Sequence, residues 1–208
     1  MHGTDIPPGA PLRAPDGAQD AALLAAYAGG DGRAARALVA RHLPRVLGLA
    51  RRLLGDAAEA EDVAQEAMLR LWRIAPQWRA EQARVSTWLY RVTVNLCTDR
   101  LRRRRTAVGG AATGEALPEP ADERPGALAT LIASDRVAAL EAALALLPER
   151  QRQAVVLRHL EGLSNPEIAE VMDTGVEAVE SLIARGRRML AARLAPRRED
   201  LGYDDDRP

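Results

Sequence analysis

Lysine and phenylalanine are absent from this 208-residue chain, and cysteine occurs only once, as Cys97. A single cysteine excludes an intrachain disulfide and a metal site built from several thiolates, and it fits a reducing compartment. Aromatic residues are limited to three Trp and three Tyr, whereas β-sandwiches and barrels usually draw on aromatic and β-branched side chains. The apolar residues are mostly Ala, Leu and Val, and Ala and Leu favour helices. We therefore expect an all-α protein.

Signals for catalysis, cofactors and membranes are equally scarce. The three histidines, His2, His42 and His159, lie far apart and follow no metal-ligand spacing. No nucleophile–base pair, paired carboxylates or phosphate-binding loop is recognisable, so we expect no catalytic residue, no cofactor and no metal. Residues 1–16 lack the apolar stretch of a signal peptide, and no run approaches the ~18 apolar residues of a membrane span. We expect a cytoplasmic protein without membrane insertion.

The charges are balanced overall but unevenly distributed. All 29 basic residues are arginines, and 29 acidic residues bring the net charge to zero. Residues 41–105 hold 14 Arg against 7 acids, whereas residues 106–127 hold one Arg against four acids. A guanidinium can bind a phosphate through two parallel hydrogen bonds. The pattern therefore predicts a basic N-terminal block followed by an acidic spacer.

Glycine and proline divide the chain into two helical domains. We expect a disordered leader at 1–19, a first domain at 20–105, a flexible linker at 106–128 that leaves the domains mobile, a second domain at 129–195, and an acidic tail at 196–208. In the first domain, Asp31 and Asp56 are candidate N-caps and Gly55 a helix end, and Pro44 should break or kink the helix that contains it. The expected helices cover 20–28, 31–54, 57–74, 86–104, a stretch from Leu131 to Leu147 that Pro148 ends, 149–161, 164–172 and 176–194.

The segment 164–190 has the pattern of a helix-turn-helix. Ser164 and Glu167 form a capping box, the turn Asp173-Thr174-Gly175 follows, and the second helix should bury Val176, Val179 and Ile183. In this motif the second helix enters the major groove of DNA. Its other face carries Glu177, Glu180, Ser181, Ala184, Arg185 and Arg188. Two packed helices without a DNA role remain an alternative, although six arginines between 185 and 198 favour phosphate contacts.

Aromatic and basic residues are interleaved in the first domain. Trp72, Trp78, Trp88 and Tyr90 lie close to seven arginines within 84–105, a combination typical of single-stranded nucleic acid binding. The alternative is that these rings belong to a helical core. Asp62, Gln65, Glu66 and Leu69 share one face of the preceding helix. That face is either a solvated surface or a docking site for a basic partner helix.

Three longer stretches resemble a known family. RLLGDAAEAEDVAQEAMLRLW at 52–72 and STWLYRVTVNLCTDRLRRRR at 86–105 resemble region 2 of the extracytoplasmic-function (ECF) sigma factors of the sigma-70 family. LPERQRQAVVLRHLEGLSNPEIAEVM at 147–172, with the helix after it, resembles their region 4. The resemblance implies a non-enzymatic subunit that binds RNA polymerase core through the β′ coiled coil and the β flap, recognises promoter DNA, and is held inactive by an anti-sigma factor.

The resemblance also implies roles for individual residues. The positions that match the core-polymerase docking surface are Asp62, Gln65, Glu66, Met68, Leu69 and Trp72. Those that match the reader of the separated −10 strand are Trp78, Arg79, Arg84, Thr87, Trp88, Arg91, Asn95, Asp99 and Arg100. Those that match the reader of the −35 duplex are Glu177, Glu180, Ser181, Ala184, Arg185, Arg187 and Arg188.

Six positions depart from the common pattern of that family. Glu177 and Ala178 stand where many members have an Ala or Gly-Thr pair. Glu180 and Leu182 stand where many members have basic residues, so the usual −35 sequence cannot be transferred, and Glu180 could accept a hydrogen bond from cytosine N4. Gly175 replaces a common Ser cap, and Gly186 replaces a common Ala at a cost of up to ~1 kcal/mol of helix propensity. Two alternatives stay open: a helix-turn-helix regulator that acts without core polymerase, and a sigma-like protein that sequesters an anti-sigma factor.

Overall fold

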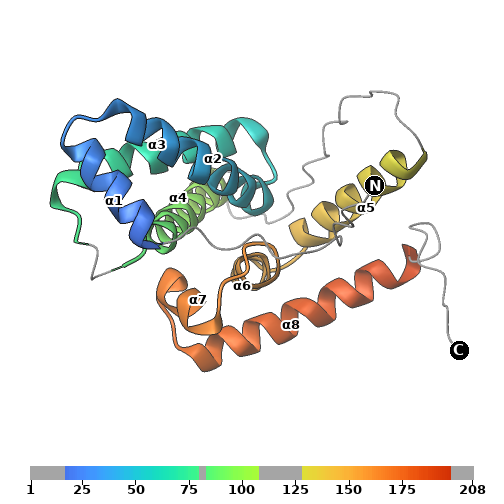
Figure 1. The fold of residues 1–208 in the computed structure, drawn as a ribbon. Helices are drawn as coiled ribbons and strands as arrows, with labels where there is room; N and C mark the ends of the chain where they lie inside the picture. The colour runs from blue at the N-terminus through green and yellow to red at the C-terminus, as the bar shows by residue number, and fades with distance from the viewer. Residues whose placement is uncertain (1–16, 80–82, 108–127, 198–208) are drawn as a thin grey trace, which may run out of the picture.

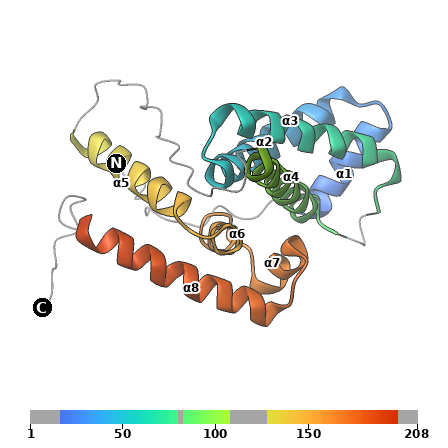
Figure 2. The same ribbon diagram turned by 180° about the vertical axis from the view of Figure 1, so that it is seen from behind.

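The computed structural model describes residues 17–79, 83–107 and 128–197, and the described part of the chain is helical, without a β-strand (Figures 1 and 2). The predicted all-α class is confirmed. The expected leader, linker and tail lie almost wholly outside these residues. None of the helices described is long and apolar enough to cross a bilayer. The helices are α1 (Gly17–Ala28), α2 (Gly32–Leu54), α3 (Ala57–Ile74), α4 (Val85–Ala107), α5 (Leu128–Ala145), α6 (Glu149–His159), α7 (Asn165–Met172) and α8 (Val176–Leu194).

Helices α1 to α4 form an N-terminal bundle whose ends follow the local chemistry of the sequence. Asp31 accepts a hydrogen bond from the Arg33 amide at 2.8 Å, and Asp56 accepts one from the Glu59 amide at 2.9 Å. Both carboxylates thus satisfy amides that the first helical turn leaves without a partner. Gly55 ends α2 with φ at 68°, a left-handed conformation that suits glycine. The predicted caps are confirmed.

Pro44 was predicted to break or kink α2, and it does not break the helix. The helix runs without a gap from Gly32 to Leu54. A proline inside a helix removes the hydrogen bond to the carbonyl four residues earlier, here that of Ala40. Both Pro44 and Ala40 are exposed, so water can hydrate the freed carbonyl. The amphipathic pattern on either side, with Leu38 and Val46 buried, keeps both segments on the same core.

The C-terminal half, α5 to α8, depends on a close crossing of α6 and α8. Gly186 lies at this crossing, where an added Cβ would stand 2.5 Å from Cγ2 of Val155. The absence of a side chain lets the two helices approach, and this explains a glycine that costs helix propensity. Arg150 donates to the Met172 carbonyl at 3.3 Å and Arg158 to the Leu163 carbonyl at 2.9 Å. These bonds fix α6 to both ends of α7.

The two halves contact each other, although the sequence led us to expect two separately mobile domains. Helix α4 lies beside α6 and α7 in both ribbon views (Figures 1 and 2), and α2 also contacts α6. One hydrophobic cluster contains Tyr90, Val94 and Cys97 of α4 together with Leu144 and Leu147 of the C-terminal half. A second cluster, formed around Leu24, Leu38, Leu71 and Leu89, stays within the N-terminal bundle. The described parts of the two predicted domains therefore share a core.

Candidate polymerase- and DNA-binding surfaces

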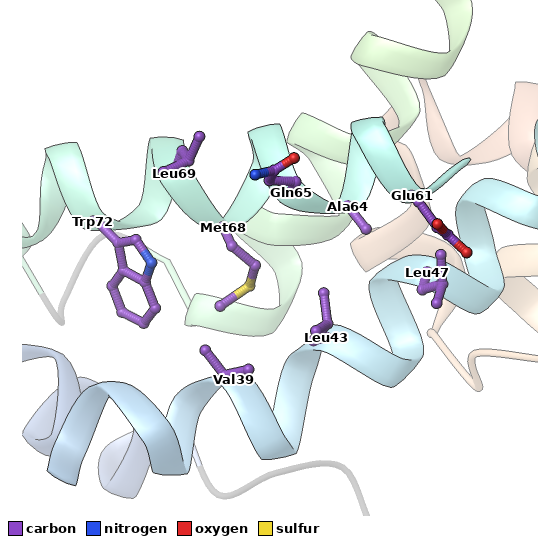
Figure 3. A pocket seen from close by; sticks show the side chains of 9 residues that line it. All are labelled: Val39, Leu43, Leu47, Glu61, Ala64, Gln65, Met68, Leu69 and Trp72. Atoms are coloured by element: carbon purple, nitrogen blue, oxygen red, sulfur yellow. The ribbon is translucent and has the colours of Figure 1, made fainter. Parts of the chain in front are cut away.

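An apolar groove runs between α2 and α3 (Figure 3). Its volume is about 320 Å³. Met68 and Trp72 point from α3 toward Val39 and Leu43 on α2, whereas Leu69 points away from α2 (Figure 3). Met68 is buried, Trp72 is half-buried and Leu69 is exposed. The groove is lined by Val39, Leu43, Leu47, Glu61, Ala64, Gln65, Met68, Leu69 and Trp72.

Polar side chains of α3 lie at the groove and beside it: Glu61 and Gln65 line the groove, whereas Asp62 and Glu66 do not. Asp62 is 69% exposed and lies 3.5 Å from Arg100, and Gln65 is exposed. Glu66 accepts a hydrogen bond from Arg70 at 2.8 Å, and this bond lowers the pKa of Glu66. An apolar centre with a polar rim is typical of protein-docking surfaces. The structure thus brings the six predicted polymerase-docking residues together on one helix.

The exposed side of α4 carries part of the residues predicted to follow the −10 strand. Arg91 and Asn95 are exposed, and Trp88 and Asp99 are half-buried. They recur at helical spacing, so they share one side of α4. Asp99 accepts from Arg102 at 3.0 Å. This side therefore offers a cation, an amide and part of an indole to a ligand.

Other predicted −10 residues are engaged within the protein. Thr87 is 6% exposed, so its hydroxyl does not reach a ligand in this conformation. Arg100 donates to the Glu59 carbonyl at 3.1 Å, and Arg84 lies 3.4 Å from Glu167 of α7. Arg79, which precedes the undescribed residues 80–82, is exposed.

The tryptophans fit both of the alternatives that the sequence left open. The rings of Trp78 and Trp88 meet edge to face, with centroids 6.0 Å apart. Trp72 packs on Tyr27 at 4.5 Å. All three indoles lie against the hydrophobic cluster of the N-terminal bundle, yet each keeps part of its surface exposed. They are therefore core residues that present an edge to solvent, which amphipathic rings commonly do.

Helices α7 and α8 form the predicted helix-turn-helix. The backbone amide and hydroxyl of Ser164 donate to the same oxygen of Glu167, at 2.9 Å and 2.7 Å. These bonds outweigh burial and lower the pKa of Glu167, and the predicted capping box is confirmed. The residue with a left-handed backbone in the turn is Asp173, with φ at 49°, rather than Gly175. Aspartate tolerates this conformation better than most residues.

One side of α8 faces solvent and carries the predicted −35 residues. Glu177, Glu180, Ala184, Arg185, Arg187 and Arg188 are exposed, and Ser181 is half-buried. Arg185 donates to the hydroxyl of Ser181 at 2.6 Å and 3.1 Å. Glu180 accepts from Asn165 of α7 at 3.4 Å. Val179 and Ile183 are buried as predicted, but Val176 is 39% exposed, so the prediction for Val176 is wrong.

The sequence did not indicate the polar contacts that join the two halves. Glu161, which follows α6, accepts from the Tyr90 hydroxyl at 2.9 Å and lies 3.5 Å from Arg52. Gln153 donates to Thr98 at 2.9 Å. The two hydrogen-bonded pairs are 71 and 55 residues apart in the sequence, and Arg52 is farther still from Glu161. No local pattern could have identified them.

Family models match two parts of the chain. The model of sigma-70 region 2 matches residues 38–107, and that of sigma-70 region 4 matches residues 138–190. The first match contains the groove and α4 as far as Ala107. The second contains α6, α7 and most of α8. The three surfaces described above therefore fall within these two matches.

Several sigma factors are similar to the chain over most of its length. RNA polymerase sigma-H factor of Pseudomonas aeruginosa is 35% identical over 189 residues, which cover 86% of this chain and 95% of that protein. ECF RNA polymerase sigma factor SigM of Mycobacterium tuberculosis H37Rv is 38% identical over 172 residues, 83% of each chain. SigE of Mycolicibacterium smegmatis is 40% identical over 162 residues, 76% of this chain but 60% of that protein.

Solved structures agree with these relatives. CnrH, solved in complex with the cytosolic domain of CnrY, is 28% identical to this chain. The match covers 86% of this chain and 98% of CnrH, with a TM-score of 0.64. Sigma factor RpoE of Bartonella quintana, solved with the anti-sigma factor NepR, is 21% identical to this chain. The match covers 77% of this chain and 96% of RpoE, and its TM-score of 0.62 supports the fold. The chain belongs to the ECF sigma factors of the sigma-70 family.

Proposed function

We propose that this chain directs promoter-specific transcription initiation in the cytoplasm as a non-enzymatic subunit of RNA polymerase. One observation carries the proposal: an apolar groove and two arginine-bearing helix faces occur on one chain, within its matches to sigma-70 regions 2 and 4. A helix-turn-helix regulator that acts without core polymerase would have no use for the groove. The similarity to whole sigma factors, up to 95% of their length, favours the sigma reading further.

Core polymerase binds at the groove in this proposal. Met68, Trp72 and the apolar side chains of α2 offer an anchor site, and Asp62, Gln65 and Glu66 offer a polar rim to a basic helix. Apolar anchors supply most of the affinity in such contacts, whereas rim charges mainly guide association and fix register. The fitting occupant is the β′ coiled coil, and the region 4 part would contact the β flap.

Promoter DNA binds at α4 and α8. Trp88, Arg91 and Asn95 would follow the separated −10 strand, since bases stack on aromatic rings while guanidinium groups hold phosphates. On α8, Arg185 and Arg188 would contact the −35 duplex. The chain has no nucleotide-hydrolysing motif that we can recognise in its sequence, so strand opening would rely on binding energy.

An anti-sigma factor would control this activity. CnrH was solved with CnrY, and Bartonella quintana RpoE with the anti-sigma factor NepR. By analogy we expect a partner that covers the groove or the DNA-binding helices of this chain. Pull-down of the full chain with a candidate anti-sigma factor, followed by transcription assays with and without that factor, tests this part.

Run-off transcription with core polymerase on the chain's own upstream region tests the main proposal. The wild-type chain should stimulate a discrete transcript, and the double variant Asp62→Arg, Gln65→Arg should lose core binding while still binding duplex DNA. Glu141→Arg is the matched control, because Glu141 is an exposed acid on α5 away from the groove. No transcript with wild type on any candidate promoter would refute the sigma reading. Equal loss with Glu141→Arg would refute the role of the groove.

A further inference from the structure

Helix α8 carries an acid among the side chains that would face DNA. Glu180 is exposed and lies in the second turn of α8, which begins at Val176. In a helix-turn-helix the N-terminal residues of the second helix contact base edges. A carboxylate at such a position repels the phosphates of DNA unless a donor on a base compensates for its charge. Within the described residues Glu180 has no ion pair, and Arg185 donates to the Ser181 hydroxyl instead. The acid is therefore free to meet a donor on a base.

Asn165 of α7 contacts this acid across the junction of the two helices. Its Nδ2 donates to Oε1 of Glu180 at 3.4 Å. The bond is long, so it orients the carboxylate more than it stabilises the fold. The second carboxylate oxygen, Oε2, accepts no hydrogen bond within the part of the chain that the structure describes. Asn165 thus holds one oxygen of Glu180 and leaves the other available to a ligand.

The amide of Asn165 can take only one orientation. Its Oδ1 is enclosed and has no hydrogen-bond partner among the described residues, whereas its Nδ2 faces the carboxylate. The reverse orientation would place the amide oxygen against the carboxylate, and two acceptors repel each other. An enclosed acceptor without a partner is unfavourable. The fold alone gives no reason for an asparagine at this position, whereas the contact with Glu180 does.

The backbone of Asn165 is fixed on both sides. Ser164 before it forms the capping box with Glu167, and Pro166 follows it. The proline ring restricts its own φ and the backbone of the residue before it. An amide on such a support loses little conformational freedom when a ligand binds, and this pre-organisation favours a specific contact.

We propose that Asn165 is a positioning residue for Glu180, and that this pair reads a cytosine of the −35 element. In the major groove cytosine presents one donor, its N4 amino group, to which a carboxylate can bind. Guanine and thymine present acceptors there, and adenine places its N7 acceptor beside its amino group, so all three oppose a carboxylate. The inference rests on the proposed function, because it concerns how the −35 duplex is read.

Transcription by the holoenzyme on a promoter library measures this reading. The library carries each of the four bases in turn at every −35 position of the promoter that wild type uses in the chain's own upstream region. Wild type should prefer cytosine at one position, on either strand, by about fivefold or more. Asn165→Ala should reduce this preference by about twofold to fivefold and leave the preferences at the other positions unchanged. Glu180→Gln should move the preference toward adenine, because an amide can bind adenine N6 and N7 together.

A double substitution separates positioning from folding. In a Glu180→Ala background, Asn165→Ala should change the base preferences no further, because the group that it orients is gone. Asn165→Asp is a second variant in case Asn165→Ala weakens α7, since a carboxylate in the first turn of a helix is favourable yet repels Glu180. Its cytosine preference should fall at least as far, and a ratio between bases is insensitive to a general loss of affinity. Glu170→Ala, at an exposed position on α7, is the control and should keep the wild-type preference.

Each result decides the inference. Transcription by wild type without a cytosine preference at any −35 position overturns the reading by Glu180. A cytosine preference that both Asn165 variants leave unchanged overturns the role of Asn165, as does a further change of preference when Asn165→Ala is added to Glu180→Ala. If wild type transcribes from no member of the library, the proposed function itself falls, and the reading falls with it.

Discussion

Gly186 provides a sharp test of the packing in the C-terminal half. In a solvent-exposed helix, Gly→Ala stabilises a protein by about 0.5–1 kcal/mol, because alanine loses less backbone freedom on folding. At position 186 the new Cβ would lie 2.5 Å from Cγ2 of Val155 and 3.4 Å from the carbonyl oxygen of Gln151. Val155 is 3% exposed and, being β-branched, has one preferred rotamer in a helix. The methyl group therefore cannot be accommodated by a side-chain rotation alone.

The magnitude follows from these two opposing effects. Relief of the contact requires α6 and α8 to move apart by nearly 1 Å, and overpacking of this kind costs about 1–3 kcal/mol. After the gain in helix propensity, Gly186→Ala should destabilise the protein by about 0.5–2 kcal/mol. In a chain of this size, each kcal/mol corresponds to roughly 2–4 °C in Tm.

Urea unfolding of four variants separates propensity from packing. Gly32→Ala is the matched control, since Gly32 is also helical and an added Cβ would meet nothing within 4 Å. It should be neutral or slightly stabilising. Val155→Ala alone should destabilise by creating a cavity. With Val155→Ala in place, the effect of Gly186→Ala should change sign and become stabilising, because the clashing methyl group is gone.

The change of sign is the decisive outcome. If Gly186→Ala stabilises the wild-type chain as much as Gly32→Ala does, helices α6 and α8 do not approach as closely as the structure indicates. Additive effects of Gly186→Ala and Val155→Ala would refute the contact as well, since residues in contact should show a coupling energy of at least about 0.5 kcal/mol.

Three further predictions concern single side chains. Ser164→Ala should lower the free energy of unfolding by about 1 kcal/mol through loss of the capping box, and an unchanged urea midpoint would contradict this. Glu180→Gln should alter the base preference at the −35 element, because a carboxylate only accepts hydrogen bonds whereas an amide also donates. Run-off assays on single-base promoter variants measure this preference, and an unchanged preference would exclude Glu180 as a reader of the −35 bases. Burial raises the pKa of Glu161 in the folded chain, against opposing effects of Tyr90, Arg52 and Arg45. The folded chain therefore holds a proton there more tightly than the unfolded chain, so the free energy of unfolding should gain most from this group below the ordinary glutamate pKa and lose that gain as pH rises through the raised value. Urea unfolding measured across that range tests this, and Glu161→Gln should flatten the profile.

Local chemistry was sufficient to predict much of the fold. The caps at Asp31 and Asp56, the left-handed Gly55 and the capping box of Ser164 depend on residues within one helical turn of each other, so their signals survive in sequence. That Pro44 does not break α2 could not be predicted, because the cost of a proline inside a helix depends on whether the freed carbonyl meets water. That depends on exposure, which in turn depends on which face of α2 the rest of the bundle covers.

The contact between the halves could not be predicted in the same way. Tyr90 and Glu161 are 71 residues apart, and Thr98 and Gln153 are 55 apart. A glycine- and proline-rich stretch separates the two halves, and such composition favours mobility whether or not the flanking helices attract each other. Tertiary packing alone determines that Glu161 is buried against the other half, and no pattern near Glu161 distinguishes it from a surface glutamate.

Charge counting also overstates how many cations α4 offers to DNA. Residues 84–105 contain seven arginines, but five of them are paired with acids, namely Arg84, Arg100, Arg102, Arg104 and Arg105. Within the described residues, Arg91 and Arg103 have no ion pair. Surface ion pairs are worth only about 0–1 kcal/mol, so phosphates could compete for the paired arginines, whereas Arg104 bridges Asp56 and Glu59 and should be released last.

Salt dependence can distinguish these possibilities. Each phosphate contact to a single strand adds about 0.7 to the slope of log affinity against log salt. If only Arg91 and Arg103 bind phosphates, α4 should contribute a slope near 1.4, and full release of all seven arginines would give about 5. We expect a value between the two, since an arginine that leaves an acid for a phosphate exchanges one ion pair for another. Arg104→Gln should then reduce stability more than it reduces the slope, whereas Arg91→Gln should reduce the slope and leave stability unchanged.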